Sequence, residues 1–287
     1  MKVSKVISID GSRKYSFGLG QGLLMEAAFF RVQGRERPNI ACVSTQLGCA
    51  VACPFCAAAH APFFRNLTKE EILFQIESIL NDNPGEDVFE EGFEVSFMGM
   101  GEPLANLGTL LAVIHEVRLR YPQITRVSVS TAGPAKRIDA LTDAMPVFPS
   151  VHLQMSLHAT NDQTRKRLVP NAPDSIQNLL RAGRRFHERT GDHVYLNYVL
   201  LKGINDSAED AHWLAQLDPK AFYVKIAALN PTAGMPMTMV GSSMEEIQNF
   251  SLQLRNQRLP HKIFVGDGLD VNASCGQLAA VPRELNV

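Results

Sequence analysis

From residue 39 onward, the sequence alternates between short apolar segments and longer amphipathic segments. The short segments predict buried strands over residues 39–45, 93–99, 126–131, 151–159, 193–201, 222–229 and 261–266. The longer ones predict a helix from Thr68, and helices over residues 107–120, 135–145, 175–191, 207–217 and 243–256. Strands joined by helical connections imply right-handed βαβ units and a parallel sheet. We therefore expect an α/β fold, a partial (β/α) barrel of the TIM type.

Capping residues mark several of these helix ends. Three predicted helices begin with a Ser or Thr followed three residues later by an acidic residue: Thr68 and Glu71, Ser207 and Asp210, Ser243 and Glu246. Gly191 is a plausible C-cap. Polar or glycine-containing segments follow the strands, among them "STQLGC", "GMGEP", "STAG", "SLHAT" and "LNPTAG". Because the carboxyl ends of parallel strands form one rim of a barrel, we expect the active site there.

The first 38 residues differ from the remainder of the chain. They predict a β-rich N-terminal extension, with a hairpin whose turn contains Asp10 and Gly11. The glycine-rich residues 18–22 lack the spacing and the strand–helix context of a dinucleotide-binding motif, and they predict a turn. The expected organisation is an extension over residues 1–38 and one barrel over residues 39–287, which ends in a loop around "CGQL".

Composition and charge narrow the class of protein. The chain has 287 residues, 45% of them hydrophobic and 20% charged, as in ordinary globular proteins. No apolar run reaches the roughly 18 residues of a membrane helix, and the first ten residues lack a signal-peptide core. We therefore expect a cytoplasmic protein without membrane association. The net charge of −1 argues mildly against a large nucleic-acid footprint, although it does not exclude local basic patches.

Four of the five cysteines lie within residues 42–56. Cys49, Cys53 and Cys56 have a C-x3-C-x2-C spacing, Cys42 precedes them, and Cys275 lies near the end of the chain. Five is an odd number, which fits a closed disulfide framework poorly, and clustered cytoplasmic cysteines more often bind metal or do redox chemistry.

The three spaced cysteines fit an iron–sulfur cluster. Thiolates from one loop can converge on a [4Fe–4S] cluster and leave the fourth iron open to the amine and carboxylate of S-adenosylmethionine. Three other interpretations exist: half of a zinc site with His60, a C-x-x-C redox pair, or buried structural cysteines. A zinc site would need a fourth ligand, and a redox pair would leave Cys49 without a role. The spacing therefore favours the cluster, and Phe55 before the third cysteine fits the radical S-adenosylmethionine (SAM) signature.

The order of motifs resembles the RlmN/Cfr family of radical-SAM RNA adenine methyltransferases. It is carried by "CVSTQLGCAVACPFC", "RNLT", "FMGMGEPLAN", "STAG", "SLHATNDQTRKRLVP", "YVLLKGIND", "LNP" and "CGQLA", between about residues 8 and 280. The C-x3-C-x2-C motif alone would indicate only the radical SAM superfamily. Together with Cys42 and the "CGQL" segment around Cys275, it is much more specific.

The resemblance implies a role for every cysteine. Cys49, Cys53 and Cys56 would bind the [4Fe–4S] cluster, and Cys275 would be methylated by one SAM. A second SAM would be cleaved to a radical that takes hydrogen from this S-methyl group, so that the carbon adds to adenine. Cys42 would then release the product by forming a transient disulfide with Cys275.

The resemblance also implies a SAM site and a general base. Gly101 and Glu102 of "GMGEP" would contact the methionyl amine, and the remaining contacts would come from Ser130, Ser156, Leu157, His158 and Asn230. Taken singly, each is more often a turn or strand residue. Glu26 is a candidate general base, since burial raises the pKa of a carboxyl group toward a useful value; it could equally be an edge-strand residue that faces water.

The sequence departs from the family pattern in two places. Family members usually carry an RNA-binding helical domain before the hairpin, whereas this sequence starts almost at the hairpin. Asp267 stands where the family has a basic residue, and Ser274 replaces a common alanine. The loss of basic surface should weaken contacts with RNA phosphates. Three basic sets remain: Arg31, Arg35 and Arg37 before the cysteine loop, Arg165, Lys166 and Arg167 after "SLHA", and Arg181, Arg184 and Arg185 on one helical face. The first two sets flank the predicted active rim, where we expect them to form part of an RNA path. We interpret the third as a solvated helix face.

The main hypothesis is therefore methylation of an sp² carbon of adenine in ribosomal or transfer RNA, with one [4Fe–4S] cluster, SAM and an external electron donor such as flavodoxin or ferredoxin. The first alternative is the same chemistry on a small molecule or free nucleotide. The second is a non-catalytic RNA-binding relative. Detecting neither a cluster nor SAM cleavage after anaerobic reconstitution would favour this alternative.

Overall fold

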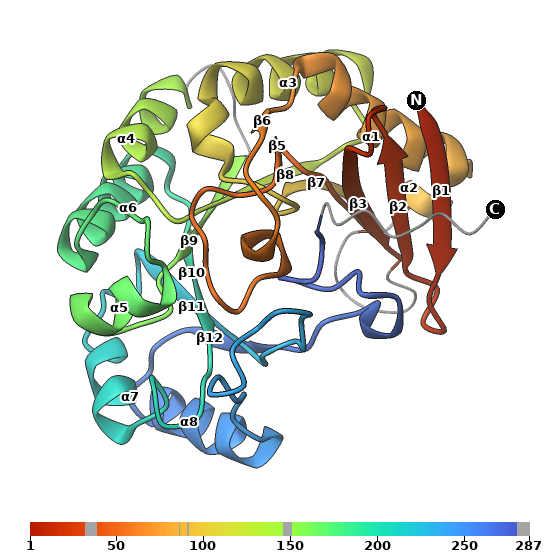
Figure 1. Ribbon diagram of the computed structural model, residues 1–287. Helices are drawn as coiled ribbons and strands as arrows, with labels where there is room; N and C mark the ends of the chain where they lie inside the picture. Colours follow the sequence, from red (N-terminus) through yellow and green to blue (C-terminus); the bar gives the residue numbers. More distant parts are fainter. Residues whose placement is uncertain (32–38, 86, 91, 146–150, 280–287) are drawn as a thin grey trace.

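The computed structural model describes residues 1–31, 39–85, 87–90, 92–145 and 151–279. One sheet in the order β1-β2-β3-β4-β7-β8-β9-β10-β11-β12 curves around a central space (Figure 1). Its strands are β1 Lys2–Ile7, β2 Arg13–Gly18, β3 Leu24–Phe30, β4 Asn39–Cys42, β7 Phe93–Phe97, β8 Arg126–Thr131, β9 Val151–Ser156, β10 Val194–Val199, β11 Phe222–Ala227 and β12 His261–Phe264. Strands β4 and β7 to β12 are parallel, which confirms the partial (β/α) barrel and its seven strands.

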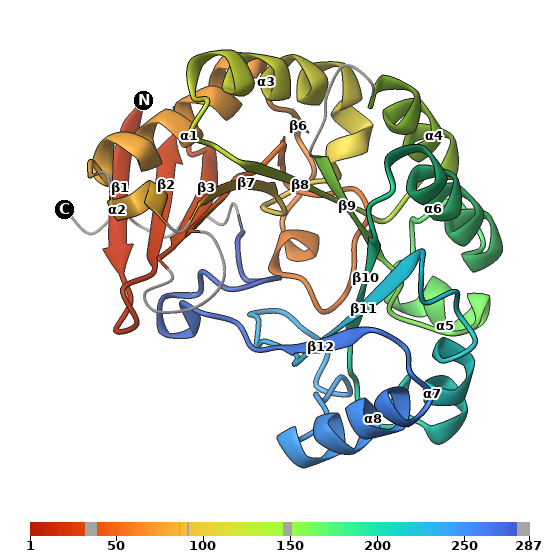
Figure 2. The ribbon, with the colours of Figure 1, turned by 180° about the vertical axis from the view of Figure 1, so that it is seen from behind.

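The helices cover the outer, convex face of the sheet, as both views show (Figures 1 and 2). They are α1 Lys69–Asp82, α2 Asp87–Glu90, α3 Leu107–Arg120, α4 Ala135–Ala144, α5 Asp162–Leu168, α6 Ile176–Thr190, α7 Ala208–Leu214 and α8 Met244–Asn256. Short 3₁₀ helices span Ala57–His60, Pro103–Asn106 and Leu269–Val271. None of the helices in the described part of the chain is long and apolar enough to cross a membrane.

The expected capping residues define the helix ends. Capping boxes begin α1 at Thr68, α7 at Ser207 and α8 at Ser243, and Gly191 ends α6 in the left-handed conformation. Helix α5 was not expected from the sequence. It begins at Asn161, whose side chain accepts a hydrogen bond from the backbone N–H of Thr164, so a capping signal was present in a helix of only seven residues.

The N-terminal extension joins the barrel sheet. Strands β1 and β2 form the expected hairpin, and β2 pairs with β3, which pairs antiparallel with β4. The glycine-rich residues 18–22 form the turn between β2 and β3, as expected. The proposed domain boundary at residue 38 lies outside the described residues and stays a prediction.

The concave side of the sheet holds two segments far apart in sequence. The loop after β4 carries the clustered cysteines, and the segment after β12 carries Cys275; Figures 1 and 2 show both inside the curve of the sheet. A two-stranded sheet, β5 Gln46–Leu47 with β6 Arg65–Asn66, closes the base of the cysteine loop. The N–H of Ala57 donates a 2.7 Å hydrogen bond to the carbonyl oxygen of Gly276, so the two segments are in contact.

Candidate active site

The three spaced cysteines face one cavity at the carboxyl ends of the strands. We call it the thiol cavity; its lining includes Cys49, Cys53, Cys56, Gly101, Glu102, Ser130, Ser156, His158, Asn197, Lys225, Asn230 and Cys275. All five cysteines are free thiols. The rim predicted from the strand ends is therefore the place where most of the candidate residues meet.

The thiols suit a cationic cluster. Burial raises the pKa of Cys49, Cys53 and Cys56, that of Cys56 to about 11, and repulsion from the neighbouring cysteines adds to this at Cys53. Such thiols stay protonated at neutral pH unless a bound cation stabilises the thiolates. Backbone N–H groups of Val51 and Ala52 hydrogen-bond to the Cys49 sulfur, as they do around iron–sulfur clusters.

The arrangement does not resemble the site of a single ion. Within the described residues, no group of three or more His, Cys, Asp or Glu side chains is placed to hold one metal ion. A four-iron cluster distributes its cysteines over different iron atoms. His60, which the zinc interpretation required, lines another cavity, and its Nε2 lies 3.2 Å from the carbonyl oxygen of Pro54.

Glu102 is a buried carboxylate at the wall of the thiol cavity. It accepts hydrogen bonds from the Thr131 hydroxyl at 2.7 Å and from the N–H groups of Ala132 at 2.8 Å and Leu104 at 3.0 Å. Burial raises its pKa to about 7 in spite of these donors. A cationic amine in the cavity would favour the ionised form, which suits the expected contact to the methionyl amine.

Gly101 is required by the geometry of the same loop. Its φ is +103°, and an added Cβ would lie 2.5 Å from Cβ of Gln46. The Gln46 amide oxygen in turn accepts the N–H of Glu102 at 2.8 Å, so a displaced Gln46 would displace the carboxylate.

We therefore predict that Gly101→Ala destabilises the protein by about 1–3 kcal/mol, from backbone strain alone, measured by denaturant unfolding. Gly108→Ala is the matched control, because Gly108 lies in helix α3 with nothing within 4 Å of an added Cβ. The control should be neutral or stabilising by up to about 1 kcal/mol. Equal stability of the two variants would contradict the steric account.

His158 also lines the thiol cavity. Burial, together with a smaller effect of the charge on Arg165, lowers the pKa of His158 to about 3, so the imidazole is neutral. Its Nδ1 accepts the N–H of Val199 at 3.1 Å, which leaves the proton on Nε2. The ring also packs edge-on against Phe55 of the cysteine loop, with ring centroids 5.2 Å apart.

The remaining expected SAM contacts divide into two groups. Ser130, Ser156 and Asn230 line the thiol cavity, whereas the side chain of Leu157 is buried in the core and its N–H donates to the carbonyl oxygen of Asn197. The amide of Asn230 donates to the Ser274 hydroxyl at 3.0 Å and to the carbonyl oxygen of Cys275 at 2.9 Å. Asn230 and Ser274 thus hold the loop that carries Cys275.

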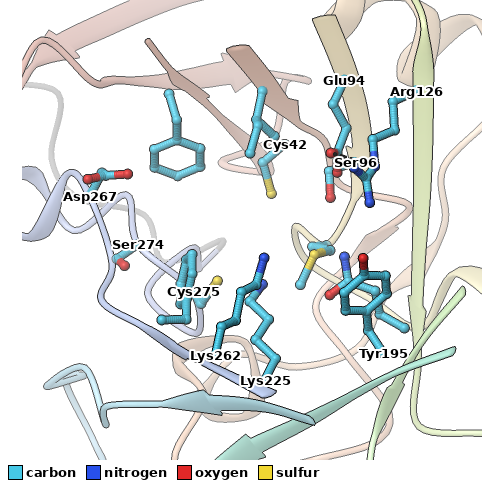
Figure 3. Close-up of a pocket in the computed structure, with 15 residues that line it drawn as sticks. Cys42, Glu94, Ser96, Arg126, Tyr195, Lys225, Lys262, Asp267, Ser274 and Cys275 are labelled. Atoms are coloured by element: carbon cyan, nitrogen blue, oxygen red, sulfur yellow. Dashed lines mark ion pairs between the residues drawn. The ribbon is translucent and has the colours of Figure 1, made fainter. Parts of the chain in front are cut away.

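A second cavity lies in the barrel lumen and shares Cys275 with the first. We call it the lumen cavity; its lining includes Phe30, Cys42, Glu94, Ser96, Arg126, Gln154, Tyr195, Lys225, Lys262, Phe264, Asp267 and Cys275. Figure 3 shows the sulfur atoms of Cys42 and Cys275 pointing into it, together with the ammonium groups of Lys225 and Lys262. Burial raises the pKa of the Cys42 thiol, and Cys275 adds to this, whereas Lys225 acts in the opposite direction.

Sequence reasoning missed several lining residues of both cavities. Asn197 and Lys225 line the thiol cavity, and Ser96, Gln154 and Lys262 line the lumen cavity. All five lie within strands, where nothing but alternation along the strand could have marked them as inward-facing.

Glu26 lies outside both of these cavities. It lines a separate pocket with Lys14, whose Nζ lies 2.9 Å from the carboxylate, and it accepts the N–H of Ala279 at 2.8 Å. The contact with Ala279 ties strand β3 to the end of the Cys275 loop, whereas Lys14 lies on the neighbouring strand β2. The role of Glu26 as general base stays a prediction.

The basic residues singled out in the sequence differ in their exposure and in their partners. Arg165 is buried and donates to the carbonyl oxygens of Ala132 at 2.8 Å and Ser156 at 3.1 Å, so the expectation that it binds RNA phosphates is wrong. Lys166 and Arg167 beside it are exposed. Arg35 and Arg37 lie outside the described residues. The α6 arginines form ion pairs with carboxylates, as a solvated helix face would: Arg181 and Arg185 with Asp139, and Arg184 with Asp218.

Comparison with known proteins agrees with this geometry. Residues 43–214 match the model of the radical SAM superfamily. A ribosomal RNA large subunit methyltransferase N from Nitrosopumilus maritimus is 34% identical over 96% of this chain and 80% of its own. A probable dual-specificity RNA methyltransferase RlmN from Thermus thermophilus is 36% identical over 98% of this chain and 78% of its own. The chain belongs to the RlmN family of the radical SAM superfamily.

A solved structure supports the family at the level of the fold. The crystal structure of a radical SAM methyltransferase from Sphaerobacter thermophilus has a TM-score of 0.87 and 33% identity, and it covers 96% of this chain and 80% of its own. The protein is thus a radical SAM methyltransferase. For an RlmN-family chain, membership implies SAM and an iron–sulfur cluster, and the thiol cavity is where this chain offers residues for both.

Proposed function

We propose that this protein methylates an sp² carbon of adenine in RNA and that Cys275 carries the methyl group. The observation that carries the proposal is the position of Cys275, which lines both the thiol cavity and the lumen cavity. A methyl carrier has to face its donor on one side and its acceptor on the other. RNA as the substrate class is supported by the names of the relatives, which are RNA methyltransferases.

The thiol cavity would hold the donor. Cys49, Cys53 and Cys56 would bind the [4Fe–4S] cluster, and SAM would be held by Gly101, Glu102, Ser130, Ser156, His158 and Asn230, with Leu157 contributing only its backbone. When bound, the two cofactors supply the methyl group and the radical chemistry that a non-nucleophilic carbon of adenine requires. Phe55 and Met98 give the cavity an apolar part of its wall.

The lumen cavity would hold the acceptor and the resolving thiol. Once the substrate is bonded through a methylene to the Cys275 sulfur, the Cys42 thiolate attacks that sulfur and an S–S bond forms. The S–C bond breaks, its electron pair passes to the methylene carbon, and a proton completes the methyl group. Lys225 lines the same cavity, and its charge favours the thiolate that Cys42 needs.

A second candidate function keeps the chemistry and changes the substrate. Arg165 is buried, and the α6 arginines are neutralised by carboxylates, which leaves a smaller basic surface for an RNA backbone. A free nucleotide or small molecule would need less of it. In either case we expect an external electron donor such as flavodoxin or ferredoxin, and a cytoplasmic location.

The test is the Cys42→Ala variant. Without a resolving thiol, the substrate should remain covalently attached to Cys275, whereas the wild type should accumulate no adduct. We would incubate the reconstituted variant anaerobically with SAM, reductant and total large-subunit RNA, and analyse it by intact mass and nuclease digestion. An adenosine-containing adduct supports the proposal; a methylated Cys275 without RNA, together with normal attachment of a free nucleotide, supports the second candidate. Normal turnover by the variant would contradict both.

A further inference from the structure

Buried polar atoms that have no hydrogen-bond partner belong to residues that line the lumen cavity. These include Oε1 of Gln154 on β9 and Oγ of Ser96 on β7, in residues that are only 8% and 2% exposed. A buried polar group without a partner costs about 1–3 kcal/mol of stability, so such groups are uncommon in a finished core. Both residues line the lumen cavity, which indicates that a ligand in this cavity supplies the missing partners.

The other residues that line the lumen cavity indicate which class of ligand it fits. Three aromatic side chains, Phe30, Tyr195 and Phe264, line the cavity, and stacking on such rings favours a planar heteroaromatic ligand. The ammonium group of Lys225 lies 4.1 Å from the ring centroid of Phe264, and that of Lys262 lies 5.7 Å from that of Tyr195. Figure 3 shows both ammonium groups pointing into the cavity, where they can donate to acceptor atoms.

The polar groups also define a hydrogen-bonding pattern. The oxygen of Gln154 requires a donor, whereas Lys225 and Lys262 can only donate. Glu94, which lines the same cavity, forms an ion pair with Arg126, whose Nε lies 3.4 Å from Oε2 but makes no hydrogen bond. A ligand that matches this pattern has an exocyclic amino group and ring nitrogens that accept hydrogen bonds. Adenine has both, whereas hypoxanthine replaces the amino group with a carbonyl oxygen.

We propose that Gln154 is the residue that recognises the exocyclic amino group of the acceptor adenine, and that the lumen cavity is the pocket for this base. The inference rests on the proposed function, because it takes the acceptor to be adenine in RNA. Cys275 is shared with the thiol cavity, so a base in the lumen cavity lies on the acceptor side of the methyl carrier. Specificity for the base would thus come from the barrel strands, and RNA backbone contacts outside the barrel would position the substrate.

The test compares two RNA hairpins that differ in one base. The first carries the adenosine that Cys42→Ala traps, and the second carries inosine at the same position. Wild-type enzyme should methylate the adenosine hairpin about 10- to 100-fold faster in kcat/KM, which is the usual value of one good base contact. In Gln154→Leu this ratio should fall close to one, mainly through a slower reaction of adenosine.

Two variants control the comparison. Gln154→Glu keeps an acceptor oxygen and has no amide donor, so it should preserve the preference for adenosine. Gln177→Leu, at an exposed glutamine of α6, should leave both rates unchanged. Methylation of Cys275 by SAM should be normal in all of these variants, because it takes place in the thiol cavity, and this shows that each variant is folded and loaded.

The possible outcomes separate the two claims. A wild type that methylates neither hairpin overturns the proposed function and this inference with it. A wild type that methylates the adenosine hairpin, with an unchanged ratio in Gln154→Leu, overturns the inference alone. A ratio lost in Gln154→Leu and kept in Gln154→Glu is the result that we expect.

Discussion

Cys275→Ala should abolish transfer of a methyl group to RNA, with a loss of at least about 10³-fold, because the carrier sulfur is gone. Binding of SAM and its reductive cleavage should persist, since Cys275 is only one part of the thiol cavity wall and the three spaced cysteines remain. The measurement is anaerobic turnover with methyl-labelled SAM, in which label in RNA and formation of 5′-deoxyadenosine are quantified from the same sample.

The control for this prediction is Cys275→Ser, which keeps nearly the same volume. The backbone of the loop is held independently of the sulfur, by Asn230 at the Cys275 carbonyl oxygen and by Ala57 at the Gly276 carbonyl oxygen. We therefore expect Ser to be as inactive as Ala while the loop stays in place. Labelled RNA from either variant would show that the methyl group does not travel through Cys275.

Cys53→Ala should remove the iron–sulfur cluster. Two thiols from one loop are too few to anchor it, and we expect less than about a tenth of the wild-type iron and sulfide after anaerobic reconstitution. The measurement is iron and sulfide content together with visible absorbance, and circular dichroism checks that the barrel is still folded.

Cys42→Ala is the matched control for cluster loss, because Cys42 lines the lumen cavity and is not part of the thiol cavity. It should keep the full cluster content. Full iron and sulfide in each of Cys49→Ala, Cys53→Ala and Cys56→Ala would refute the ligand assignment.

Much of the fold could be predicted from local signals. The strands of the parallel sheet are short apolar runs, and the helix ends carry their own caps, as Thr68 does with Glu71. Helix α5 was missed because its seven residues are dominated by charged side chains. The inward orientation of Arg165 follows from helix phase and tertiary contacts with the ends of β8 and β9, which a local pattern does not contain.

The site could be predicted in part. Motifs marked the thiol cavity because its residues lie in loops at strand ends, such as Glu102 and His158. The lumen cavity was not predicted, because the strands are covered on both faces, and alternation alone does not tell which of the two faces a polar residue such as Gln154 occupies. Its inward side became defined only when strands distant in sequence closed around a common space.

The central claim is that Cys275 carries the methyl group between the two cavities. The most direct measurement is peptide mass spectrometry of the reconstituted wild-type enzyme after anaerobic incubation with SAM that carries a deuterated methyl group. We predict the deuterated label on the peptide that contains Cys275, and no label on the peptide that contains Cys42. An unlabelled Cys275 in an enzyme that transfers the same label to RNA would contradict the account.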